Sequence, residues 1–141
     1  MNSTSADSYP TLALIGRILV AAVFLISGLG KLASPDATIG YIASVGLPAP
    51  TLGYVVAMVL ELVGGVLMIA GYQTRLIAAL LAAYSIITAL IFHHAFGDQN
   101  QMFHFLKNLA MAGGLIQVVV FGAGAYSLDS RRRMSTARRA S

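Results

Sequence analysis

The chain has 141 residues, 57% of them hydrophobic and 10% charged, with a mean hydropathy of +0.79. Soluble domains carry about 25% charged residues, so a water-soluble fold this poor in charge would lack the polar surface needed to cover it. The absence of cysteine excludes disulfides, thiolate catalysis, Cys-ligated zinc and iron–sulfur clusters. The net charge of +4 does not predict nucleic-acid binding, because five of the nine basic residues lie in the last eleven positions.

Four apolar stretches are long enough to cross a bilayer, which takes about 20 residues of helix. They are expected at about 11–33, 51–70, 74–96 and 103–123. The predicted fold is therefore all-α, an integral membrane bundle of four transmembrane helices over residues 11–125. A short segment, 1–10, precedes this domain, and a basic tail, 126–141, follows it.

The connections between these stretches carry breaker residues, such as Ser34-Pro35-Asp36 and Leu47-Pro48-Ala49-Pro50. Between them, Ala37–Val45 has the spacing of a short amphipathic helix at the membrane interface. The first stretch could instead be a secretory signal peptide. However, residues 1–10 hold no basic residue, and the apolar run exceeds the roughly 7–15 residues of such a signal.

The distribution of Lys and Arg predicts the orientation, because cytoplasmic loops are enriched in both. Arg75 lies between the second and third spans, and five arginines lie in the tail. The opposite side carries only Lys31 and Lys107, at span ends where they can reach water. Both termini are therefore expected on the cytoplasmic side.

Two ionisable residues lie inside the spans, where a charge costs about 2.5–3.5 kcal/mol. Glu61 is near the middle of the second span and Arg17 is in the first. In antiparallel helices their depths would differ by roughly 6 Å, which an arginine side chain can cover. The sequence therefore predicts a buried Arg17–Glu61 pair. Such a pair could be proton-active or could only hold two helices together.

The first two spans also present matching faces at helical spacing. One comprises Arg17, Ala21, Phe24, Gly28 and Lys31, and the other comprises Gly53, Ala57, Glu61, Gly64, Gly65 and Met68. Since small residues let membrane helices approach closely, these faces are expected to pack together.

Polar residues collect at the outer ends of the third and fourth spans: His93, His94, Asp98, His104, Lys107 and Asn108. Histidines at a wet interface suit proton exchange, quinone hydrogen bonding or metal ligation. No zinc-binding spacing occurs among them, so no metal site is predicted. The individual roles of the three histidines are left open.

The chain resembles the DoxX family of small bacterial membrane proteins over about residues 12–124. The resemblance rests on five features in order: Arg17, Phe24–Leu32, Glu61-Leu62-Val63-Gly64-Gly65, Gly71-Tyr72-Gln73-Thr74-Arg75 and Lys107–Gly114. It implies a four-helix bundle of the bacterial inner membrane that is associated with redox chemistry. Relatives in that family include a subunit of a thiosulfate:quinone oxidoreductase and components linked to quinone or catechol stress.

The leading functional hypothesis is a membrane subunit that binds quinone or quinol in an intramembrane pocket lined by Arg17 and Glu61. These two residues would form a proton-active catalytic pair, and His94, Lys107, Lys31 and Asn108 would bind the substrate. No motif for a bound cofactor appears, so quinone would be a substrate and electrons would need a redox partner protein. The alternatives are a non-catalytic scaffold that recruits partner proteins and, more weakly, a small-solute transporter acting as a homo-oligomer.

Overall fold

The computed structural model describes residues 5–139 of the chain. Residues 1–4 of the amino-terminal segment and 140–141 of the tail lie outside the described residues. The elements are α1 (Ser5–Ser8), α2 (Pro10–Ala33), α3 (Pro35–Ser44), α4 (Pro50–Met58), the π-helical segment η1 (Val59–Val63), α5 (Gly64–Ala70), α6 (Thr74–Phe92), α7 (Gln99–Phe121) and α8 (Leu128–Arg139). This part of the chain contains no strand.

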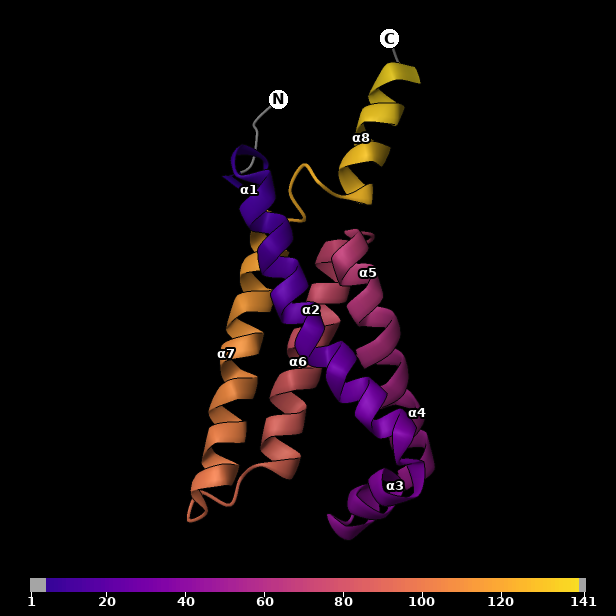
Figure 1. Cartoon of the computed structure of the whole chain (residues 1–141), viewed down its shortest axis with the longest axis vertical. Helices are drawn as coiled ribbons and strands as arrows, with labels where there is room; N and C mark the ends of the chain where they lie inside the picture. Colours follow the sequence, from indigo (N-terminus) through magenta and orange to yellow (C-terminus); the bar gives the residue numbers. More distant parts are fainter. Residues whose placement is uncertain (1–4, 140–141) are drawn as a thin grey trace.

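Four helices are long and apolar enough to span a membrane, and together they confirm the predicted fold class. They are α2, the continuous helix from Pro50 to Ala70 formed by α4, η1 and α5, and then α6 and α7. α3 crosses one end of this bundle, whereas α1 and α8 lie at the other end (Figure 1). We call the end with Arg75 and α8 the arginine end, and the end with His93 and His104 the histidine end.

The loop between α6 and α7 lies about four residues earlier in the chain than the sequence predicted. α6 ends at Phe92 instead of near residue 96, and α7 begins at Gln99 instead of near residue 103. The side chain of Asp98 accepts a hydrogen bond from the Asn100 amide at 2.8 Å, which satisfies one of the free N–H groups of the first turn of α7. Because of this cap, α7 begins about four residues before the apolar stretch on which the prediction was based.

The expected contact between the first two spans is present, and its core is small side chains alternating with large ones. Arg17, Ala21, Phe24 and Gly28 form the buried face of α2, and Ala57, Glu61, Gly64, Gly65 and Met68 form the opposing buried face. A Cβ atom at Gly65 would lie 2.7 Å from Leu25 Cδ2, so α5 can approach α2 this closely only with glycine there.

We expect Gly65→Val to lower the free energy of unfolding by about 1–3 kcal/mol, because the added side chain overpacks the α2–α5 contact. Gly113→Val is the matched control: it makes the same change in the interior of α7, where an added Cβ meets nothing within 4 Å. Thermal unfolding in detergent measures both. Equal stability of the two variants would contradict the close packing at Gly65.

The start of the tail is bound to the bundle through Asp129. Its carboxylate accepts hydrogen bonds from the amides of Gln73 and Thr74 at 2.8 and 2.9 Å, and from the Thr74 hydroxyl at 2.7 Å. The Asp129 amide donates to Gly71 O at 2.9 Å. α8 is thereby attached to the turn where α5 ends and α6 begins, and from there it extends away from the bundle (Figure 1).

The pKa of Asp129 lies below its ordinary value. Burial, the largest influence, would raise the pKa, but the hydrogen bonds from Thr74 and Gln73 and the nearby charge of Arg133 together outweigh it. Because the folded-state pKa is lowered, this stabilisation is complete above the unfolded pKa of about 3.9 and is lost as pH falls through the folded value.

We therefore expect the amides of Gln73 and Thr74 to lose protection from hydrogen exchange below about pH 4, after correction for intrinsic rates. Asp129→Asn should remove the same protection at neutral pH, whereas Asp36→Asn, in α3, should leave it unchanged. Full protection at acid pH would show that the carboxylate charge is not needed for this contact.

Candidate functional site

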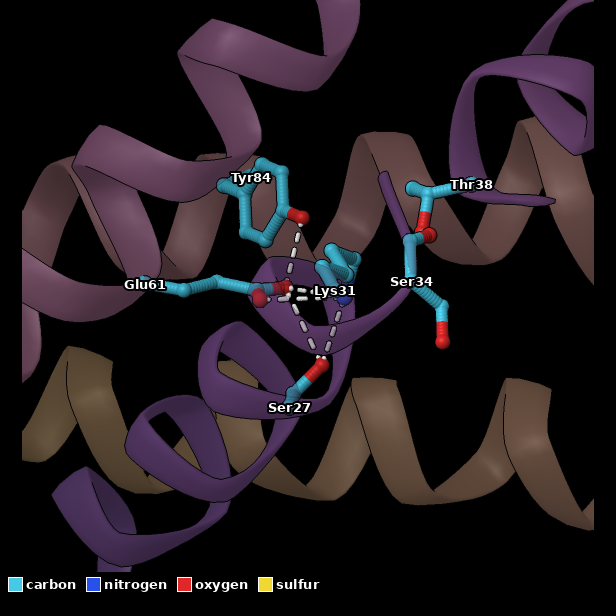
Figure 2. Close-up of polar contacts among 6 residues, drawn as sticks. All are labelled: Ser27, Lys31, Ser34, Thr38, Glu61 and Tyr84. Carbon is cyan, nitrogen blue, oxygen red and sulfur yellow. Dashed lines mark hydrogen bonds and ion pairs between the residues drawn. The ribbon is translucent and has the colours of Figure 1, made fainter. Parts of the chain in front are cut away.

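Glu61 is the centre of a polar cluster at the middle of the bundle. Its side chain is only 4% exposed, and its carboxylate contacts three other side chains (Figure 2). Lys31 Nζ donates to Oε1 and Oε2 at 2.9 and 3.0 Å, and Tyr84 Oη donates to Oε1 at 2.7 Å. Ser27 Oγ donates to Oε1 at 3.2 Å. The buried carboxylate is therefore both paired and hydrogen-bonded, which is what burial of a charge requires.

Three membrane helices contribute to this cluster. Ser27 and Lys31 are four residues apart on α2 and share a face, and Lys31 Nζ also contacts Ser27 Oγ at 2.6 Å. Tyr84 comes from α6. Glu61 lies at the centre of η1, the π-helical turn that interrupts the Pro50–Ala70 helix. Such π turns within α-helices are rare and are frequently found at functional sites.

A cavity of about 610 Å³ adjoins the cluster. Its polar lining comes from Ser27, Lys31, Thr38, Tyr41, Glu61, Tyr84, Thr88, His93, His104, Lys107 and Asn108, and its apolar lining from side chains such as Phe24, Val56, Leu60, Leu80, Ile87 and Met111. This volume falls within the range of about 300–1,000 Å³ typical of ligand sites, which are also mainly apolar with a few convergent polar groups. A cavity with the size and lining of a ligand site thus lies between α2, α3, α4, η1, α6 and α7.

The predicted Arg17–Glu61 pair is wrong. Arg17 Nη1 donates to the carbonyls of Met68 and Ile69, both at 3.0 Å, and Nη2 donates to the carbonyl of Tyr126. Glu61 is paired with Lys31 instead. Arg17 is also absent from the lining of the cavity; it lines a separate groove of about 350 Å³ between α2 and α7.

The direction of helical side chains explains this correction. Each side chain in a helix leans toward the helix N-terminus. In antiparallel helices Arg17 therefore leans toward the arginine end and Glu61 toward the histidine end, so the two diverge. Arg17 meets the carbonyls of Met68 and Ile69 in the last turn of α5, at the negative end of the helix dipole. Glu61 meets Lys31, whose side chain leans back from the last turn of α2.

The other predicted substrate-binding residues divide into two groups. Lys31, Lys107 and Asn108 line the cavity, whereas His94 is exposed and is not part of the lining. The helix ends at Phe92, so His94 has left the helical phase that would direct it inward. His93 and His104 line the cavity in its place.

Sequence reasoning missed Tyr84 and Ser27 as site residues. A signal for Ser27 was available, since it lies one helical turn before Lys31 on the same face. Tyr84 lies in the third span next to Ser85, and only its contact with Glu61 distinguishes it from a residue of the bundle core. In residues 5–139, no three metal-binding side chains converge.

The fold and this site define a small multi-pass membrane protein with a paired carboxylate inside the bilayer. The chain belongs to the DoxX family, whose model matches residues 12–94.

Two similar proteins come from Escherichia coli strain K12. The inner membrane protein YphA is 39% identical over 127 residues, covering 86% of this chain and 91% of that protein. The inner membrane protein YqjF is 34% identical over 116 residues, covering 82% and 88%. This chain is accordingly a multi-pass protein of the inner membrane.

A third relative carries a functional name. The Bacillus subtilis strain 168 protein named "Putative oxidoreductase CatD" is 37% identical over 78 residues, covering 55% of this chain and 56% of that protein. No solved structure matches the chain.

The Arg17 contacts predict a structural role for that residue. Replacing Arg17 with Met removes three hydrogen bonds from the guanidinium to backbone carbonyls, so we expect the free energy of unfolding to fall by about 2–4 kcal/mol. Arg17→Lys should recover only part of the loss, because an ammonium lacks the planar fork that reaches several acceptors.

Thermal unfolding in detergent measures these variants, with Arg75→Met, at an exposed position of α6, as the control. If Arg17→Met were as stable as Arg75→Met, the guanidinium would not hold α2, α5 and the Tyr126 segment together.

Proposed function

We propose that this protein binds a quinone or quinol in the cavity, with the headgroup against Glu61, Lys31 and Tyr84. The observation that carries the proposal is the Glu61 cluster: a buried carboxylate with cationic and hydroxyl partners, facing a mainly apolar cavity within the membrane-spanning region. Intramembrane ionisable residues are functional candidates by default, because lipid makes them costly to keep.

The chemistry of the cluster matches both redox forms of a quinone headgroup. The carbonyl oxygens of a quinone only accept hydrogen bonds, and Lys31 and Tyr84 are donors. The hydroxyls of a quinol also donate, and the Glu61 carboxylate is an acceptor. Glu61 can therefore take a proton from a quinol hydroxyl, while the ammonium of Lys31 stabilises whichever negative charge remains.

The cavity also offers a route for a lipophilic tail. Val56, Leu80 and Ile87 line it and are 47%, 45% and 54% exposed on the lipid-facing surface. An isoprenoid chain can leave the cavity past these side chains into the bilayer, with its headgroup retained at Glu61. A water-soluble ligand would gain nothing from this lateral opening.

Electrons from a bound quinol would pass to a redox partner protein, since the sequence carries no motif for a resident redox group. The name of the Bacillus subtilis relative, which refers to an oxidoreductase, supports this class of role.

A scaffold that recruits partner proteins is the second candidate, and α8 favours it. This helix is exposed, carries five arginines and is fixed to the bundle through Asp129 and through Arg132, which lies over the Tyr72 ring at 5.4 Å. A basic helix held in one orientation at the membrane surface is suited to contact an acidic partner.

The test of the quinone proposal is the amount of quinone that copurifies with the protein in mild detergent, measured by mass spectrometry of the lipid extract. We expect the wild type to retain quinone and Glu61→Gln to retain about tenfold less or lower still, because a charged hydrogen bond contributes about 1.5–3 kcal/mol. Tyr84→Phe should weaken retention by a smaller factor.

Asp36→Asn is the control, since it removes a carboxylate that lies outside the cavity. A folded wild-type protein that retains no quinone, even when quinone is added in excess, would contradict the proposal. Partner capture with and without residues 128–141 would then test the scaffold.

A further inference from the structure

The polar groups of the cavity lie on one side of Glu61. Along α2 the polar lining residues, Ser27 and Lys31, lie between Phe24 and the histidine end. Along α6 and α7 the corresponding residues are Thr88, His93 and His104, which are also nearer the histidine end than Tyr84 and Met111 are. A polar path therefore leads from Glu61 toward the histidine end.

The opposite direction is closed by the apolar core. Ala21, Met68, Leu81 and Leu115 each have no exposed surface, and each lies between the Glu61 cluster and the arginine end on its own helix. Beyond this layer Arg17 is 1% exposed and is occupied by backbone carbonyls. Interiors packed in this way leave few voids large enough for water, so they offer protons no path.

Two histidines stand at the open end. The rings of His93, at the end of α6, and His104, in α7, are stacked with centroids 4.9 Å apart. Lys107 Nζ lies 3.2 Å from His104 Nδ1. Because an ammonium can only donate, Nδ1 is the acceptor in this contact, and the proton of the neutral His104 ring is on Nε2. His93 Nδ1 faces the side-chain oxygen of Gln101 at 3.0 Å and therefore donates, which leaves its Nε2 as an acceptor.

We propose that Glu61 exchanges protons with one aqueous phase only, the one at the histidine end, and that His93 and His104 relay these protons at the mouth of the cavity. His104 can release a proton from Nε2 and His93 can accept one at Nε2. Because stacked rings do not direct their nitrogens at one another, this transfer would run through water at the mouth of the cavity. The positive-inside rule places this end outside the cytoplasm, so the proton of a bound quinol would leave on the extracytoplasmic side. The biological use of this proton exchange rests on the proposed quinone function, but the tests below use no quinone.

Other titratable groups also face this path and will influence its pH dependence. They are Lys31 on α2, Tyr41 on α3, Glu61 on η1, Tyr84 on α6 and Lys107 on α7. Of these groups, Lys31 is paired with Glu61, and Lys107 lies beside His104 at 3.2 Å.

The absence of cysteine from the chain allows a direct test of sidedness. Ser27→Cys places a thiol beside Glu61. We expect it to react with a membrane-impermeant anionic methanethiosulfonate from the side that labels Gln99→Cys, and to be unreactive from the side that labels Ser135→Cys. Ser85→Cys, which is 1% exposed in α6, should react from neither side. Reaction from the Ser135 side, from both sides equally, or from neither side would overturn the one-sided access.

The relay is tested by infrared detection of the Glu61 carboxyl band, identified by its loss in Glu61→Gln, after a pH jump on each side of reconstituted vesicles. We expect His104→Ala to slow the response by about 100-fold without shifting its midpoint, and imidazole in the medium to restore the rate. Unchanged kinetics in His93→Ala and His104→Ala, or a slowing that imidazole does not restore, would overturn the role of the histidines. Because neither readout depends on a ligand, both can succeed while the protein binds no quinone.

Discussion

The ion pair between Lys31 and Glu61 is the interaction on which the site depends. A lone carboxylate between membrane helices would take up a proton, since lipid offers it neither water nor counter-charge. Lys31 supplies the counter-charge, and the hydroxyls of Tyr84 and Ser27 supply hydrogen bonds. These four groups come from three helices, so the cluster fixes the relative positions of α2, η1 and α6. Removing the ammonium would change both the charge of the cavity and the packing around it.

Arg17 and Glu61, the two ionisable residues buried within the spans, have different kinds of hydrogen-bond partner. Both terminal nitrogens of Arg17 donate to backbone carbonyls, two of them at the C-terminal end of α5, whereas its buried Nε has no hydrogen-bond partner; this arrangement closes the arginine end of the bundle. Glu61 is satisfied by side chains, which can change protonation state and can rearrange around a ligand. The difference separates a cation held by backbone from an anion that we propose to be chemically active, although both residues lie on the buried, facing sides of adjacent helices.

The cavity is polar at one end and closed at the other because the two ends of the bundle are built differently. At the arginine end, the helices are joined by a short turn at Gly71 and by the Asp129 contacts, and small and large side chains fill the space between them. At the histidine end, α3 and the loop before α7 surround the cavity with side chains that can bind water. Membership of the DoxX family accounts for the four-helix bundle and its place in the inner membrane. The position of the cavity within the bundle places Glu61 next to the proposed quinone and the proposed proton path.

Several features followed from the sequence alone because they depend on composition and spacing. The four spans, the buried face of α2 from Arg17 to Gly28, and the close contact at Gly64 and Gly65 were predictable, since periodicity decides which residues share a face. The pairing of charges was not predictable. Depth along an idealised helix favoured Arg17 for Glu61, and only the tertiary structure shows that the two side chains lean to opposite ends. Likewise, only the end of α6 at Phe92 decided that His93, and not His94, faces the cavity, because a helix end changes the direction of every residue after it. Sequence thus determined which faces meet, and the tertiary structure decided which polar groups touch, because contacts between helices depend on side-chain direction and helix termination as well as on residue spacing.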